Sequence, residues 1–279
     1  MNAHNIPVCL TIAGSDSGGG AGVQADLRAF GFFETFGTSV ITAITAQNPL
    51  EVTAIHGVPV DDIVAQYRAV AKVFDLRAIK TGMLFEPSII NTVAAELERR
   101  PATTPLVVDP VMVATNGARL LQDDAVDAMV DRFLPLATLM TPNLPEADII
   151  HGDEVRSREQ MITAAAALAA RYDSGCLLKG GHNTGADAAV DILALADGIV
   201  YELATPVVAA KSTHGTGCTL SSAIAANLAH GRELLDAAVA AKAYVYHNLQ
   251  ACRAVGSEVY AMYPPTGNDE SVVQVKEVS

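Results

Sequence analysis

The chain has 279 residues, half of them hydrophobic, and 31 acidic against 18 basic residues give it a formal net charge of −13. This acidic balance argues against nucleic acid or an anionic membrane surface as a partner. With no tryptophan and 5% aromatic residues, the core must consist of Ala, Val, Leu and Ile, which suits parallel strands covered by helices. The sequence contains no apolar run of about 18 residues and no basic, apolar leader. We therefore expect a cytoplasmic protein that handles small molecules.

Strand-like and helix-like segments alternate along the whole chain. Short apolar and β-branched runs predict strands over 8–13, 38–45, 52–58, 76–80, 105–108, 138–140, 176–179, 188–195 and 199–203, the last two forming a hairpin. Amphipathic or alanine-rich spacing predicts helices over 21–33, 61–74, 87–97, 124–133, 158–170, 219–229 and 234–255. This alternation is typical of an α/β fold with a mostly parallel central sheet and helices on both faces. No linker is visible, so we expect a single domain over 1–279, with its core in about 8–255 and a flexible tail over 264–279.

The cysteines indicate neither disulfides nor a zinc site. Cys9, Cys176, Cys218 and Cys252 lie far apart in the sequence, and no pair has the spacing of a metal-binding motif. Cys9 and Cys176 fall in apolar strand-like runs and are predicted to be buried.

Polar motifs follow several of the predicted strands. Ligands of open parallel sheets bind beyond the carboxyl ends of the strands. The motifs at these ends are Gly14-Ser15-Asp16, Thr81-Gly82, Asp109-Pro110, Thr141-Pro142-Asn143 and Gly180-Gly181-His182. Their shared position predicts one site at this edge of the sheet.

The run from Thr213 to Leu220 is the most informative motif. Gly215-Thr216-Gly217 precedes a small-residue helical pattern, so the glycines are expected to open a helix whose free N–H groups favour a phosphate or a developing anion. Cys218 would lie at the same helix start, where the free N–H groups and the helix dipole favour negative charge. This predicts a lowered thiol pKa and a role as base or nucleophile. The alternative is a glycine-rich turn with a buried cysteine that acts as a small hydrophobe.

A second glycine-rich loop spans residues 14–22. Residues 20–25 fit the GxGxxA pattern of dinucleotide-binding oxidoreductases, but no acidic residue follows the second strand. The loop also lacks the lysine of a P-loop, so it is either a tight turn or a place where a substrate approaches the backbone. Gln47 ends the next apolar strand, and a hydrogen bond to a heteroaromatic ligand would explain an amide there.

The remaining candidates each have a structural alternative. Asp109 suits a metal ion or a phosphate-bound water, or it forms a turn. Asn143 and Glu146 have the spacing of a helix capping box. Lys179 places a cation where a phosphate could bind, whereas His182 and His214 are more typical of structural histidines.

Taken together, the chain resembles the hydroxymethylpyrimidine/phosphomethylpyrimidine kinases of thiamine synthesis, within the ribokinase-like fold. The resemblance is carried, in family order between about residues 8 and 250, by the runs 11–26, 37–48, 80–84, 108–112, 141–147, 179–182 and 214–219. The segment 256–265 departs from the Gly-Pro-Val-Asn-His-like end that is frequent in that family.

The resemblance implies a role for each matching position. The pyrimidine pocket would be lined by Gly14, Asp26, Gln47, Met83 and Val111. ATP would be bound by Asn143, Lys179 and Thr213, and Mg²⁺ would be held by Asp109 and Glu146. The anion hole would be formed by Gly215, Thr216 and Gly217, with Lys179 approaching the phosphates. Cys218 would stand where most ribokinase-like enzymes carry an aspartate base.

The implied function is an ATP- and Mg²⁺-dependent kinase. It would phosphorylate 4-amino-5-hydroxymethyl-2-methylpyrimidine and then the resulting monophosphate, in a chain expected to be a homodimer. A pyridoxal kinase of the same fold is the first alternative. A dinucleotide-binding oxidoreductase and a catalytically silent binding protein are further alternatives. The presence of Asp109, Lys179 and Cys218 counts against the silent protein.

Overall fold

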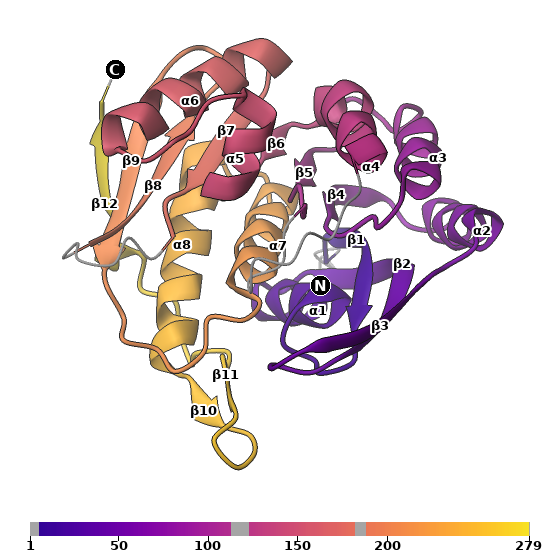
Figure 1. Cartoon of the computed structure of the whole chain (residues 1–279), viewed down its shortest axis with the longest axis horizontal. Helices are drawn as coiled ribbons and strands as arrows, with labels where there is room; N and C mark the ends of the chain where they lie inside the picture. Colours follow the sequence, from indigo (N-terminus) through magenta and orange to yellow (C-terminus); the bar gives the residue numbers. More distant parts are fainter. Residues whose placement is uncertain (1–5, 113–122, 182–187, 279) are drawn as a thin grey trace, which may run out of the picture.

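The computed structural model describes residues 6–112, 123–181 and 188–278, and a ten-stranded sheet organises them (Figure 1). Along the sheet the strands are β12 (Gln274–Glu277), β9 (Val200–Pro206), β8 (Ala188–Ala194), β7 (Gly175–Lys179), β6 (Leu139–Met140), β5 (Leu106–Val108), β4 (Leu76–Thr81), β1 (Val8–Asp16), β2 (Phe36–Gln47) and β3 (Val52–Gly57). Neighbouring strands from β7 to β2 are parallel. Pairing is antiparallel at β2–β3, β7–β8, β8–β9 and β9–β12.

Helices cover both faces of the sheet (Figure 1). One face packs against α1 (Gly22–Phe32), α7 (Thr216–Ala229) and α8 (Leu234–Gln250). The other packs against α2 (Val60–Ala71), α3 (Pro87–Leu97), α4 (Asp123–Ala128), α5 (Leu144–His151) and α6 (Arg158–Tyr172). A π-helical turn (Met129–Phe133) and a 3-10 turn (Leu134–Leu136) follow α4. No helix in the described ranges is long and apolar enough to cross a bilayer.

The two-residue period of the strands divides their side chains between two cores. In β1, Cys9 belongs to the core under α1, α7 and α8, while Leu10 and Ile12 belong to the opposite core. All three are almost completely buried, and each Leu or Ile contributes about 1.5–3 kcal/mol through burial. Cys176 is also buried, so both cysteines predicted to be internal are confirmed. The predicted α/β class, with a mostly parallel sheet covered on both faces, is confirmed as well.

The C-terminal expectations were wrong in two places. The tail over 264–279 was expected to be loose, but a 3-10 turn (Glu270–Val272) leads into β12, which pairs with β9. Arg232 also binds both carboxylate oxygens of Glu270 at 2.7 Å. The side chains of β12 are exposed, so backbone hydrogen bonds hold a strand whose sequence lacks an apolar signal. The last helix ends at Gln250 instead of residue 255, and the hairpin of β10 (Arg253–Ala254) and β11 (Tyr260–Ala261) projects beyond it (Figure 1).

Candidate active site

A cavity of about 640 Å³ opens at the carboxyl ends of β1, β4, β5, β6 and β7, beside the start of α7. The predicted edge of the sheet therefore carries the site. Within the described ranges, the cavity lining contains the predicted residues Gly14, Gln47, Met83, Asp109, Val111, Asn143, Glu146, Lys179, Thr213, Gly215, Thr216, Gly217 and Cys218. His182 lies outside the described residues. The lining does not extend beyond Leu249 in the described part of the chain, so the divergent segment 256–265 lies away from it.

Asp26 is the exception, and its predicted place in the pocket wall was wrong. Its carboxylate is completely buried behind the wall, with Lys80 Nζ 2.9 Å from each oxygen. Thr11 and Ser222 each donate a hydroxyl hydrogen bond to it at 2.6 Å. Burial lowers the pKa of Lys80, but attraction to Asp26, Cys218 and Asp109 and the hydrogen bond to Asp26 together outweigh it and raise the pKa above its usual value. Lys80, which sequence reasoning did not single out, lines the cavity in place of Asp26.

The start of α7 has the predicted form of an anion site. Gly215 caps the helix with φ of 86°, and a Cβ there would collide with the carbonyl oxygen of Gly20, so both conformation and space require glycine. Among the described residues, no side chain caps the helix through a hydrogen bond, although the Thr213 carbonyl accepts hydrogen bonds from the backbone and hydroxyl of Thr216. The first-turn N–H groups beyond Thr216 are thus available to a ligand in the cavity.

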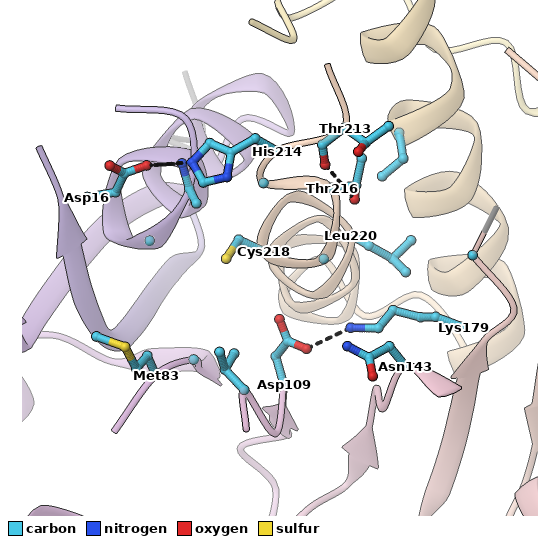
Figure 2. A pocket seen from close by; sticks show the side chains of 18 of the residues that line it. Asp16, Met83, Asp109, Asn143, Lys179, Thr213, His214, Thr216, Cys218 and Leu220 are labelled. Atoms are coloured by element: carbon cyan, nitrogen blue, oxygen red, sulfur yellow. Dashed lines mark hydrogen bonds and ion pairs between the residues drawn. The ribbon is translucent and has the colours of Figure 1, made fainter. Parts of the chain in front are cut away.

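Cys218 lies on this first turn, and its sulfur points into the space between Met83, Asp109 and the His214 loop (Figure 2). The predicted lowering of its pKa is wrong. Burial raises the pKa of the thiol to about 11, and attraction to Lys80 offsets only part of this effect. Desolvation of a thiolate thus exceeds the stabilisation expected from the helix terminus, and the resting thiol is neutral near pH 7.

Asp109 and Lys179 form an ion pair on the other side of the cavity floor (Figure 2). Lys179 Nζ lies 2.8 Å from Asp109 Oδ1, which also accepts a hydrogen bond from Thr141 at 3.2 Å. Burial lowers the pKa of Lys179, but Asp109 and Glu146 outweigh it and raise the pKa above its usual value. The lysine is therefore a charged group at the place predicted for a phosphate.

Asn143 and Glu146 serve as a capping box and also face the cavity. Asn143 Oδ1 accepts from the Glu146 backbone, and Glu146 Oε2 accepts from the Asn143 backbone, both at 2.9 Å. Glu146 is nonetheless almost completely buried, and burial raises its pKa to about 7 against the opposing effect of Lys179. The capping-box interpretation is confirmed, and the place of both side chains in the cavity lining is compatible with the predicted functional role.

The donor set suits a magnesium ion that arrives with phosphates. Asp109 and Glu146 supply carboxylate oxygens, and the described residues contain no cluster of three or more His, Cys, Asp or Glu. Mg²⁺ is usually bound by one or two carboxylates together with water and substrate phosphates, not by an all-protein cage. The residues present therefore fit this ion, and they would need a polyphosphate to complete its coordination.

Another part of the cavity lining comes from β1, β2 and the segment after β4. A Cβ at Gly14 would lie 2.7 Å from the methyl carbon of Met83, so the glycine lets Met83 pack against the backbone. Sequence reasoning missed a pair in this lining. His214 Nε2 lies 2.9 Å from Asp16 Oδ2, although the two residues are 198 positions apart in the sequence. The available signals were an aspartate in the first strand-end motif and a histidine directly before Gly215, and neither indicated the pairing.

Comparisons with known proteins agree on one family. The family model described as phosphomethylpyrimidine kinase matches residues 16–262. The hydroxymethylpyrimidine/phosphomethylpyrimidine kinase of Haemophilus influenzae is 45% identical over 243 residues, which are 86% of this chain and 90% of that protein.

Solved structures show the same fold over most of the chain. Phosphomethylpyrimidine kinase from Clostridium difficile is 39% identical, with a TM-score of 0.76 over 86% of this chain and 98% of its own. Pyridoxal kinase from Staphylococcus aureus in complex with AMP-PCP and pyridoxal is 32% identical, with a TM-score of 0.85 over 98% and 99% of the two chains.

Proposed function

The chain belongs to the phosphomethylpyrimidine kinase family, and on that premise we infer that it is an ATP-dependent kinase of thiamine biosynthesis. It phosphorylates 4-amino-5-hydroxymethyl-2-methylpyrimidine and then the monophosphate. The observation that supports this function best is the helix start of Gly215, Thr216 and Gly217, which carries Cys218 on the same turn and meets the Asp109–Lys179 pair at Gly217, where a Cβ would lie 3.3 Å from Lys179 Nζ. An acceptor hydroxyl on the Cys218 side would face a phosphate chain on the Lys179 side.

Each residue then has a defined task in the transfer. The hydroxymethyl oxygen forms a bond to the γ-phosphorus as the bond to the ADP oxygen breaks, and the hydroxyl proton passes to Cys218 in its thiolate form. First-turn N–H groups of α7 and the Lys179 ammonium stabilise charge on the transferring group. Mg²⁺, held by Asp109 and Glu146, would neutralise phosphate charge. Gly14, Gln47, Met83 and Val111 hold the pyrimidine, and Asn143 and Thr213 contact the nucleotide.

Incubation with MgATP and the pyrimidine alcohol, followed by mass spectrometry, tests the function directly. We expect the monophosphate first and the diphosphate later. Pyridoxal as the alternative acceptor addresses the second candidate function, which is favoured by the close structural match with a pyridoxal-bound kinase. Formation of pyridoxal 5′-phosphate without any pyrimidine phosphate would make pyridoxal kinase the preferred function and overturn the pyrimidine kinase assignment.

The metal assignment predicts a specific response to Glu146→Gln. EDTA should stop turnover and added Mg²⁺ should restore it, because the acidic chain needs a cation to accept a polyphosphate. The variant keeps an acceptor for the capping hydrogen bonds but loses the charge, so the Mg²⁺ concentration for half-maximal rate should rise. Glu154→Gln is a matched control, since it removes the same charge from a side chain that is 81% exposed. An unchanged Mg²⁺ dependence in Glu146→Gln would leave Glu146 as a capping residue only.

The homodimer that the resemblance implies and the cytoplasmic location expected from the sequence stay predictions.

A further inference from the structure

Three polar side chains meet where the glycine loop after β1 touches the loop before α7. His214 Nε2 lies 2.9 Å from Asp16 Oδ2 and 3.4 Å from Gln47 Nε2. Gln47 Oε1 lies 3.3 Å from Thr45 Oγ1. Asp16, Thr45, Gln47 and His214 all line the cavity. The hydrogen positions in this group decide which way the Gln47 amide faces, because its two ends have the same shape.

Asp16 determines where the histidine proton resides. Its Oδ2 accepts hydrogen bonds from the backbone N–H groups of Gly20 at 3.0 Å and Ala21 at 2.8 Å, and Oδ1 accepts from Gly18 at 2.8 Å. Burial raises the pKa of Asp16, but hydrogen bonds from His214 and these backbone groups outweigh it and hold the pKa below its usual value. An ionised carboxylate only accepts, so His214 Nε2 carries a hydrogen and donates it to Asp16.

Thr45 imposes a second condition on the amide. Its hydroxyl lies 2.9 Å from the carbonyl oxygen of Ser15, which can only accept. The single hydroxyl hydrogen of Thr45 is therefore used, and its oxygen can only accept a hydrogen bond from Gln47. Thr45 is buried on β2 opposite Asp16 on β1, so this arrangement is held by the sheet.

Both neighbours thus require the same orientation of the amide. His214 Nε2 carries a hydrogen that it donates to Asp16, so it cannot accept from an amide nitrogen, and the Gln47 oxygen belongs beside it. Thr45 offers an acceptor, so the Gln47 nitrogen belongs there, with the two ends of the amide exchanged relative to a placement in which Nε2 faces His214. We propose that His214, held by Asp16, is a positioning residue that fixes Gln47 in this orientation and thereby selects the donor and acceptor order of the substrate ring. This inference rests on the proposed function, in which Gln47 contacts the pyrimidine.

The fixed amide leaves one lone pair and one N–H for a ligand, in a set order. An aminopyrimidine edge offers an amino donor next to a ring-nitrogen acceptor and matches one order. The 4-oxo analogue offers a carbonyl acceptor next to a ring N–H and needs the reverse. If Gln47 rotated to suit it, the amide N–H would face the His214 N–H, and the amide oxygen would face a hydroxyl without a free hydrogen. Unpaired polar groups of this kind weaken binding.

The imidazole has little room to adapt. A Cβ at Gly20 would collide with Cδ2 of His214, so the ring packs directly on the glycine backbone. The side chain of His214 is 22% exposed and that of Asp16 3% exposed. The pair is therefore fixed from the glycine loop as well as from the α7 loop.

The test compares the affinities of the 4-amino and 4-oxo pyrimidines by calorimetry. His214→Phe keeps a ring against Gly20 but removes the donor, so the preference for the amino compound should fall by about tenfold or more. His214→Gln places an amide nitrogen near the position of Nε2 and should restore much of the preference. His230→Phe is the matched control, because His230 bonds the Phe33 carbonyl at 2.7 Å and does not line the cavity. An unchanged preference in a folded His214→Phe variant would overturn the positioning role.

Two further measurements separate this inference from the proposed contact. Gln47→Leu should weaken binding of the 4-amino pyrimidine about tenfold and leave ATP binding nearly unchanged. Unchanged pyrimidine affinity would overturn both the contact and the selectivity. Nitrogen-15 NMR of the parent protein should show hydrogen on Nε2 of His214, and a neutral ring with hydrogen only on Nδ1 would overturn the positioning role without touching the proposed function.

Discussion

Replacing Cys218 with alanine is expected to lower kcat by about 10²–10⁴-fold, the range that general-base catalysis typically supplies. KM for ATP should change little, because the backbone N–H groups of the first turn of α7 survive the substitution. Cys218→Asp should retain more activity than Cys218→Ala, since a carboxylate can accept the same proton. A kcat for the alanine variant within about threefold of the parent would instead make Cys218 part of the pocket wall, with a loose transition state that needs little base.

The pH profile separates these two roles further. The thiol is neutral below its pKa of about 11, so the thiolate fraction rises with pH. If the thiolate is the base, kcat/KM for the pyrimidine should rise by about tenfold per pH unit between pH 7 and 10, because this parameter reports the ionisation of the free enzyme. The same plot for Cys218→Ala should be flat. Parallel profiles in parent and variant would assign the rise to another group.

The fold was accessible from the sequence because its signals are local. Apolar strands such as 8–13 and 176–179 are followed by polar strand ends, and that order alone predicts a parallel sheet with a site at one edge. The sequence pattern did not predict β12, because its four side chains are exposed and its position depends on backbone hydrogen bonds to β9. A strand that buries no side chain leaves no periodic apolar signal.

The site was predictable where one segment carries the chemistry, and was not where distant segments combine. The glycine start of α7 and the Asn143–Glu146 capping box follow from short motifs. The Asp16–His214 pair spans 198 positions, so only the folded chain brings it together. The protonation state of Cys218 was likewise not predictable from a short motif. The helix start was visible in the sequence, but the burial that raises its pKa was not.

The pair of Lys80 and Asp26 should carry the largest single effect on stability. Both side chains are 0% exposed and lie 2.9 Å apart. Lys80→Met leaves the Asp26 carboxylate buried without a counter-charge, which typically costs about 3–5 kcal/mol. Urea unfolding monitored by circular dichroism should show this loss as a lower midpoint. Arg68→Met is the matched control, because Arg68 pairs with Glu96 at 2.7 Å but its side chain is 62% exposed, and it should change the midpoint little.

The double variant Asp26→Asn with Lys80→Met tests whether the pair of Lys80 and Asp26 stabilises the fold or whether Asp26 also contributes to pyrimidine binding. Removing both charges removes the uncompensated carboxylate, and the amide oxygen introduced by Asp26→Asn can still accept from Thr11 or Ser222, so most of the lost stability should return. Because Asp26 lies behind the cavity wall whereas Lys80 lines the cavity, the double variant and Lys80→Met alone should have similar pyrimidine affinities when measured by calorimetry. A double variant that folds well but binds the pyrimidine much more weakly than Lys80→Met alone would restore Asp26 to the substrate pocket, against its position in the structure.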